Sequence, residues 1–279
     1  MPQTRTPWGL DDTKKLVMLY PVGTKGEITA AFPNRAWNTI KGKARRLNLK
    51  LSRACYKCDL SILLDKSDVS FYWLGFLCAD ANFTEHTVGL EISEKDVVHL
   101  NTFCNYINYP ETGLFRRSRK IFGKQQNATL CAYANHKEVV QKLRNTYSIS
   151  NNKTKNPIDI SSMLDLELMC FFIGFIDGDG SICFRKNGSI VVSIEIDKSW
   201  FSILKSFELL LPRLNIITSV RALLYTRSDT RQTFARWQTS SRPVFYQFRQ
   251  FAVEHHLPIM HRKWFSRDSS CTIFSKPVI

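Results

Sequence analysis

The first section of the chain, residues 1–52, places its apolar residues at helical spacing. Proline-containing breaks at residues 21–23 and 33–34 divide it into three short stretches. Apolar side chains three or four positions apart lie on one face of a helix, so each stretch predicts an amphipathic helix. The pattern predicts a small all-α domain whose core holds Trp8, Leu16, Leu19, Tyr20, Trp37, Ile40, Ala44 and Leu47.

Two later stretches are almost continuously apolar and contain acid near their ends, at residues 71–83 and 171–183. Aligning Gly75 with Gly174 places Asp80 on Asp179, an offset of 99 residues (179 − 80 = 99). Both stretches predict an apolar helix that contains a glycine and terminates in aspartate. The repeat therefore predicts two related units in one chain.

The segments after each opening also match. The first copy predicts strands near 81–86, 88–93, 113–117 and 128–134, with helices at 95–107 and 136–147. The second predicts strands near 181–185, 190–196, 220–225 and 232–239, with helices at 199–211 and 242–255. Each copy has the order αββαββα, so we expect an α+β fold with antiparallel sheets. The expected divisions are a linker at 53–67, a first unit at 68–158 and a second at 159–279.

The charge favours a polyanionic partner. The chain of 279 residues carries a formal net charge of +15, and Lys and Arg gain affinity for nucleic acid by releasing phosphate counterions. The third predicted helix offers Arg35, Asn38, Lys41, Arg45 and Arg46 for DNA contact. The predicted strands and their ends offer Arg116, Arg117, Arg119, Arg185, Lys186, Arg221, Arg227, Arg231 and Arg236.

The two terminal aspartates predict a cation site. Gly75 and Gly174 lack side chains, so the two helices that contain them can cross at close range. The C-terminal end of a helix is partially negative, and bringing two such ends together, each with an aspartate, is unfavourable without a cation. Carboxylates, backbone carbonyls and water are the ligands that Mg²⁺ takes, so we expect a shared Mg²⁺ site.

The two openings resemble the LAGLIDADG motif, and residues 68–279 resemble a two-motif, single-chain LAGLIDADG homing endonuclease. The resemblance implies saddle-shaped antiparallel sheets and internal pseudo-two-fold symmetry in a monomer. It also implies metal-dependent, site-specific cleavage of both strands of a long double-stranded DNA target, leaving 3′ overhangs. The front domain resembles a Myb/SANT-like helix-turn-helix, whose last helix enters the major groove and lengthens the recognised site.

The resemblance also implies roles for individual residues. Asp80 and Asp179 are the expected metal ligands, with the carbonyls of Ala79 and Gly178 nearby and with Mn²⁺ able to replace Mg²⁺. Each unit is expected to carry a basic residue after its last helix, and Lys153 and Lys263 match it. A polar residue is expected at the end of the second strand: Glu94 in the first copy, and either Asp197 or Lys198 in the second.

The first copy departs from the motif. Cys78 stands where the first aspartate is expected, and Ala81 stands where the final glycine is expected. Ala81 is expected to strain the turn after the helix unless Asn82 adopts the left-handed conformation. The departure leaves two alternatives open: the first half is active and both strands are cut, or it is impaired and the protein nicks one strand.

Two other function classes remain open: a group I intron maturase that binds RNA, and a DNA-binding protein impaired in cleavage. No stretch predicts a signal peptide or a membrane span, so we expect an intracellular protein with reduced thiols. The spacing of Cys55 and Cys58 suits zinc, but no second ligand pair follows it, which favours chance. For His255, His256 and His261 the pattern favours helix-end caps over a metal site.

Overall fold

The computed structural model describes residues 7–21, 25–49, 58–110, 113–117, 120–121, 124–125, 129–228 and 231–265. The chain forms two compact units, Met1–Tyr56 and Lys57–Ile279, and each is described by itself. The predictions for Arg119 and Cys55 lie outside the described residues. Among the described helices, none is long and apolar enough to cross a bilayer.

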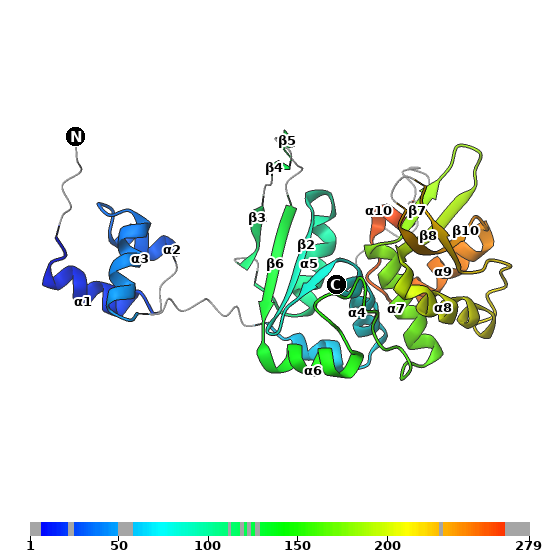
Figure 1. Cartoon of the computed structure of the whole chain (residues 1–279), viewed down its shortest axis with the longest axis horizontal. Helices are drawn as coiled ribbons and strands as arrows, with labels where there is room; N and C mark the ends of the chain where they lie inside the picture. Colours follow the sequence, from blue (N-terminus) through cyan, green and yellow to red (C-terminus); the bar gives the residue numbers. More distant parts are fainter. Residues whose placement is uncertain are drawn as a thin grey trace. The chain divides into compact units, whose positions relative to one another are not determined.

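The smaller unit contains the three expected helices, α1 (Leu10–Leu19), α2 (Lys25–Ala31) and α3 (Trp37–Arg46), as Figure 1 shows. One buried residue of α1, one of α2 and two of α3 meet in its core: Leu16, Ile28, Ile40 and Ala44. Tyr20 and Phe32 are also buried in this cluster, whereas Trp8 and Trp37 pack against it from its margin.

The first half of the larger unit follows the expected order. It contains η1 (Leu60–Leu64), α4 (Asp68–Asp80), β1 (Ala81–Phe83), β2 (Thr87–Ser93), η2 (Glu94–Asp96), α5 (Val97–Tyr106), β3 (Phe115–Arg117), β4 (Lys120–Ile121), β5 (Lys124–Gln125), β6 (Thr129–Asn135) and α6 (Lys137–Tyr147). Four of these strands form an antiparallel sheet in the order β1-β2-β6-β3. The β4–β5 pair is an addition that the sequence pattern did not predict.

The second half has the corresponding elements: α7 (Asp165–Gly178), β7 (Ser181–Phe184), β8 (Ile190–Asp197), η4 (Lys198–Trp200), α8 (Phe201–Arg213), β9 (Leu223–Thr226), β10 (Thr233–Thr239), α9 (Arg242–Glu254) and α10 (His261–Trp264). Its sheet has the corresponding order, β7-β8-β10-β9, and is also antiparallel. The expected α+β fold with antiparallel sheets is confirmed.

The segment expected to be a linker, 53–67, is in part a structured piece of the larger unit. Residues 60–64 form η1, and Leu60 and Leu63 are buried. Asp59 begins η1 by accepting a hydrogen bond from the Ser61 amide, and Ser67 caps α4 by accepting one from the Ser70 amide. The apolar patch that looked like part of a linker therefore belongs to the core.

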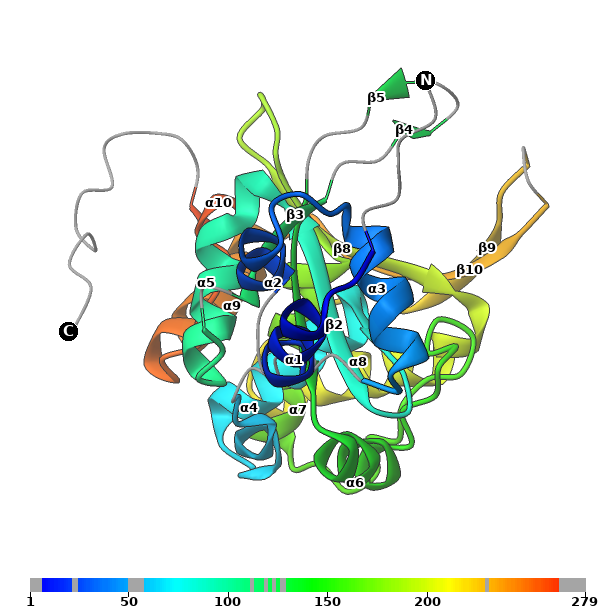
Figure 2. The ribbon, with the colours of Figure 1, turned by 90° about the vertical axis from the view of Figure 1, so that its left-hand side faces the viewer.

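Helices α4 and α7 lie side by side between the two sheets (Figure 1). Helices α5 and α6 contact the first sheet, and α8 and α9 contact the second. The central strands alternate buried and half-buried positions over 90–93 and 192–197, as in sheets with one covered and one open face. One end of the β9–β10 pair projects beyond the helices of this unit (Figure 2).

Candidate active site

The central helices cross where their glycines meet. A Cβ atom on Gly75 would overlap the carbonyl oxygen of Phe171, and one on Gly174 would overlap the carbonyl oxygen of Tyr72. The two contacts are reciprocal, since each glycine faces the backbone of the other helix. Farther along, a Cβ on Gly178 would overlap the side chain of Ala79. The crossing therefore brings the C-terminal ends of α4 and α7 together.

Each of these helix ends carries an aspartate. Asp80 is the last residue of α4, and Asp179 follows α7 as its C-cap. Both residues reach solvent, although neighbouring groups partly enclose their carboxyl groups. Partial burial and the neighbouring charge of Asp179 raise the pKa of Asp80 to about 6. Burial also raises the pKa of Asp179, while the two nearby lysines lower it. The carboxylates repel each other, and a bound cation would relieve the repulsion.

A lysine ammonium lies on each helix end. Lys153 Nζ donates to the carbonyl oxygens of Cys78 and Ala79 at 2.6 and 2.5 Å. Lys263 Nζ donates to those of Ile176, Asp177, Gly178 and Gly180 at 3.0, 2.6, 3.1 and 2.8 Å. These carbonyls are the unpaired, partially negative end of a helix, where a cation is stabilising. Burial lowers the pKa of both lysines, and the nearby aspartates oppose that shift.

Each lysine segment is held by the opposite half. The Trp200 indole, beside α8, donates to the carbonyl oxygen of Lys153 at 3.0 Å. Arg262, next to Lys263, forms an ion pair with Asp96 at the start of α5, with one hydrogen bond of 2.8 Å. Because both of these contacts join one half to the other, the positions of the two ammonium groups depend on the whole of the larger unit.

Asp177 is a buried acid beside the site, and the sequence pattern predicted no role for it. Its carboxylate accepts hydrogen bonds from the Tyr72 hydroxyl at 2.6 Å, the Met260 amide at 2.8 Å and the Trp264 indole at 2.6 Å. Burial raises its pKa to about 6, and the hydrogen bonds oppose the shift. The sequence did contain a sign of this role, because an acid inside an otherwise apolar helix must have hydrogen-bond partners when it is buried.

The expected strain after the first helix is absent. Ala81 is extended, with φ −80°, and leads directly into β1. Asn82 is not among the described residues with positive φ, so neither alternative expected after the helix, a strained Ala81 or a left-handed Asn82, occurs. In the second half a Cβ on Gly180 would lie 2.6 Å from the carbonyl oxygen of Ile176. Close backbone approach, and not left-handed geometry, explains that glycine.

The donor set at the helix ends fits a hard divalent cation. Two carboxylates converge there, and oxygen ligands are those that Mg²⁺ and Mn²⁺ prefer. The carbonyls of Ala79 and Gly178, expected as ligands, accept lysine hydrogens in this structure. The carboxylates of Asp80 and Asp179 are therefore the primary candidate ligands, and the two carbonyls are shared with the lysines.

Most of the paired strand arginines lie beside a glutamate of a central strand. Arg117 pairs with Glu91 at 3.2 Å, and Arg236 pairs with Glu195 at 2.6 Å. Arg227 also pairs with Glu195, and Arg116 pairs with Glu94 at 2.6 Å. Glu94 lies in η2, whereas Asp197 ends β8 and caps η4 by accepting from the Ser199 amide at 3.0 Å. Four other predicted DNA contacts are exposed outside the strands, in the segments beside them: Arg185, Lys186, Arg221 and Arg231.

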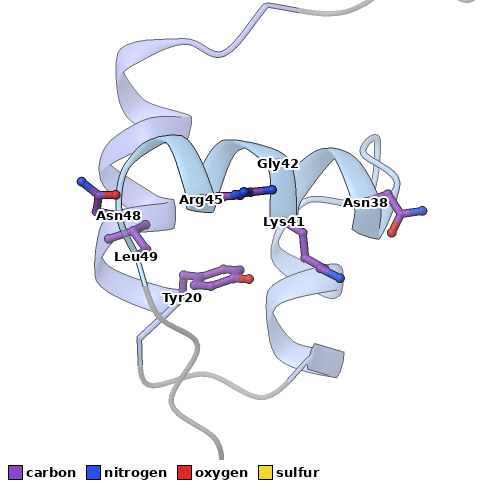
Figure 3. A pocket seen from close by; sticks show the side chains of 7 residues that line it. All are labelled: Tyr20, Asn38, Lys41, Gly42, Arg45, Asn48 and Leu49. Carbon is purple, nitrogen blue, oxygen red and sulfur yellow. The ribbon is translucent and has the colours of Figure 1, made fainter.

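The smaller unit has a basic hollow of about 620 Å³ beside α3. Asn38, Lys41 and Arg45 line it from one side of that helix, and Tyr20 lies across from them (Figure 3). Arg46 is exposed on α3, with its Nε donating to the Gly42 carbonyl at 3.3 Å.

Arg35 has a different environment from the other residues predicted to contact DNA. Only 8% of its side chain is exposed, it binds Asp12 at 2.6 Å and its guanidinium lies 4.1 Å from the Trp8 ring centre. It precedes α3 instead of lying on it. Arg35 therefore contributes to the packing of this unit, and its contact with DNA stays a prediction.

No protein-family model matches the sequence, and no curated protein matches it. Solved structures of I-DmoI, a LAGLIDADG homing endonuclease, are similar to the chain. One, of I-DmoI with DNA and Ca, is 11% identical with a TM-score of 0.40, and the match covers 69% of this chain and 99% of that one. Another, of I-DmoI with DNA and Mn, is 13% identical with a TM-score of 0.37, covering 68% and 96%. Among the solved structures to which this chain is similar are thus those of a homing endonuclease.

Proposed function

We propose that this chain is a metal-dependent endonuclease that cuts double-stranded DNA at a specific, long site. One observation carries the proposal: two aspartates from separate halves converge at crossed helix ends, each beside a lysine ammonium. The motif resemblance of the sequence agrees with this site. The net charge of +15 suits a nucleic-acid substrate.

The residues of the site suit phosphodiester hydrolysis. Asp80 and Asp179 would hold Mg²⁺ or Mn²⁺, which when bound neutralises the phosphate and activates water. Hydrolysis forms a bond between water oxygen and phosphorus and breaks the bond to the 3′ oxygen. Lys153 and Lys263 add positive charge beside the carboxylates and fix the helix ends.

Cleavage of both strands follows from the duplicated arrangement. The reciprocal crossing at Gly75 and Gly174 supports a pseudo-two-fold relation between halves, with one aspartate serving each strand. Two active centres across the minor groove would leave 3′ overhangs. One chain contains both halves, so a monomer suffices for both cuts.

The open faces of the sheets are proposed to contact DNA. They carry arginines paired with Glu91 and Glu195, and these pairs hold the guanidinium groups extended over the sheet. Arginine reads guanine edges or binds phosphate, so the same side chains suit both types of contact. The exposed basic residues of the adjoining turns, such as Arg185 and Lys186, suit phosphate contact.

The smaller unit is proposed to be a helix-turn-helix that extends the recognised site. Its third helix is basic, and Asn38, Lys41 and Arg45 face one hollow beside it. Amide and basic side chains on a single helix face are typical of major-groove readers. Removing this unit is expected to shorten the footprint without altering the cleavage chemistry.

A randomised library of duplex targets with Mg²⁺ tests the proposal. The wild type should cut a recurring sequence. Asp80→Asn should slow cleavage of one strand by about 10³-fold, and Asp179→Asn should slow cleavage of the other strand by the same factor. Asp165→Asn is the matched control, since it removes an exposed acid at the other end of α7.

Failure of the wild type to cut or nick any sequence with Mg²⁺ or Mn²⁺ overturns the proposal. DNA binding without cutting would then identify a cleavage-impaired DNA-binding protein. Binding of structured intron RNA, with rescue of its splicing, would identify a maturase.

A further inference from the structure

Three side chains of different chemistry meet near the start of α4, away from the aspartates. They are Asp68, Cys170 and His255, and one carboxylate oxygen, the sulfur and one ring nitrogen all lie within 4.8 Å of one another. Asp68 is the first residue of α4, Cys170 lies in α7 and His255 is the C-cap of α9. The cluster therefore draws one residue from the first half and two from the second.

The cluster is closed on one side and open on the other. Cys170 is fully buried, whereas 42% of the Asp68 side chain and 23% of the His255 side chain are exposed. His255 Nδ1 and Asp68 Oδ2 lie 2.7 Å apart, and Phe251 stacks on the imidazole with ring centres 4.1 Å apart. Two candidate ligands are thus already oriented toward each other, with a path to solvent.

We propose that Asp68, Cys170 and His255 form a second metal site, for a thiophilic divalent cation of the Zn²⁺ class. One sulfur, one nitrogen and one oxygen are ligands of such cations, whereas Mg²⁺ prefers oxygen alone. Three protein ligands leave one tetrahedral position for water, which the exposed side of the cluster can supply.

The local charges suit this cation. The Asp68 carboxylate lies against the His255 imidazole and beside the Cys170 sulfur, so the cluster already offers one negatively charged ligand. A bound cation would take the place of the thiol proton and of the hydrogen between His255 and Asp68. Ligand atoms in a tetrahedral zinc site are roughly 3.3–3.7 Å apart, so the present separations need only small side-chain rotations.

The site would join the halves and take no part in cleavage. Asp68 and Asp80 lie at opposite ends of α4, and a helix of this length separates them by about 18 Å. A cation shared by α4, α7 and α9 would connect the first half to the second, as the glycine crossing does. It would stabilise the packing that positions both active-site aspartates.

Titration of the full chain with Co²⁺ in excess Mg²⁺ tests the site, because Mg²⁺ occupies hard oxygen sites and Co²⁺ reports thiolate ligands by absorption. We expect one equivalent bound, with a near-ultraviolet thiolate band that Cys170→Ser abolishes. His255→Ala and Asp68→Asn should weaken binding by at least about tenfold. Zn²⁺ should displace Co²⁺ and, at a hundredfold excess over its Kd, raise Tm by about 5–10 °C.

Matched controls separate this cluster from other ligands. Cys58→Ser and Cys183→Ser change thiols outside the cluster, and His256→Asn changes the neighbouring exposed histidine at a position with φ 51°, which asparagine tolerates. All three should keep the band.

Absence of a thiolate band, or a band that survives Cys170→Ser and disappears in Cys58→Ser, overturns the proposal. If Cys170→Ser does not fold, unchanged Co²⁺ affinity in Asp68→Asn and His255→Ala overturns it equally. The readout does not depend on DNA cleavage, so it stands apart from the outcome of the nuclease test.

Discussion

The two halves of the larger unit build the same helix end with different supports. In the second half Asp177 accepts three hydrogen bonds and Lys263 binds four carbonyls. In the first half the residue at the corresponding position is Cys78, which is buried, and Lys153 binds two carbonyls. The terminal aspartate and its lysine are repeated, whereas the interactions behind them are not.

This difference distinguishes the features that form the site, which both halves share, from the interactions that support only one half. Crossing glycines, terminal aspartates and lysines occur in both halves because they set the position and charge of the site. The Asp177 network instead connects the second motif helix to the first half, since Tyr72 lies on α4 and also hydrogen-bonds His99 at 3.2 Å. We infer that the second helix end is the more firmly held.

The largest expected effect tests the part that the halves share. Gly75→Ala and Gly174→Ala would each push a methyl group into the backbone of the other helix, where no side chain can rotate away. Both should lower the free energy of unfolding by about 3 kcal/mol or more, and by similar amounts. Gly42→Ala is the control, because a Cβ there meets nothing within 4 Å. Urea unfolding measures all three, and a small or strongly unequal cost in the first two would refute the reciprocal crossing.

The repeat made most of the fold predictable. Period-two strands after each opening, together with glycine and aspartate at the same offset, indicated both sheets and the helix ends that meet. The supports were not predictable in this way, because they join residues far apart in sequence. Asp177 with Tyr72 and Arg262 with Asp96 have no local pattern.

Two differences between the structure and the sequence pattern have specific physical causes. Arg35 looked like a surface charge by sequence spacing, but Trp8 and Asp12 from the preceding segment enclose it. Ala81 looked strained because the motif ends in glycine, but the helix passes directly into an extended strand. Both cases depend on contacts or backbone angles that a residue type alone does not determine.

Removing the buried acid tests the difference between the halves. Asp177→Ala would leave the Tyr72 hydroxyl and the Trp264 indole without their acceptor in a buried site, and should cost about 2–3 kcal/mol of unfolding free energy. Cys78→Ala, at the corresponding position, removes one buried sulfur and should cost about 1 kcal/mol. Chemical denaturation compares the two directly. Equal costs would show that the Asp177 network adds no support to the second half.

Replacing each lysine tests whether the difference between the two halves also affects the rate of DNA cleavage. Lys263→Met removes an ammonium that binds four carbonyls, whereas Lys153→Met removes one that binds two. Methionine retains the length of the chain and loses the charge. We expect about a hundredfold loss in cleavage of one strand for Lys263→Met and about tenfold in the other for Lys153→Met. Rates on a duplex labelled separately on each strand decide this, and equal losses on both strands for either variant would contradict independent centres.

The smallest expected effect is a pH dependence that the aspartates impose on stability. The folded-state pKa of Asp80 is raised to about 6 from an ordinary 3.8, so the folded protein binds this proton more tightly than the unfolded chain does. Its contribution to stability is therefore fully present below about pH 4 and is lost as pH rises through 6. Without metal, Tm of the wild type relative to that of Asp80→Asn should fall across this interval.

Asp165 provides a control of opposite sign. Its hydrogen bond from Arg213 lowers its pKa, so Tm of the wild type relative to that of Asp165→Asn should rise with pH over the acidic range. Mg²⁺ should reverse the Asp80 trend above pH 6, because it binds the ionised carboxylates that otherwise repel each other. If the Tm difference between wild type and Asp80→Asn stays constant with pH and does not respond to Mg²⁺, the two carboxylates do not share one electrostatic site. The two halves would then be neighbours in the fold without forming a common centre.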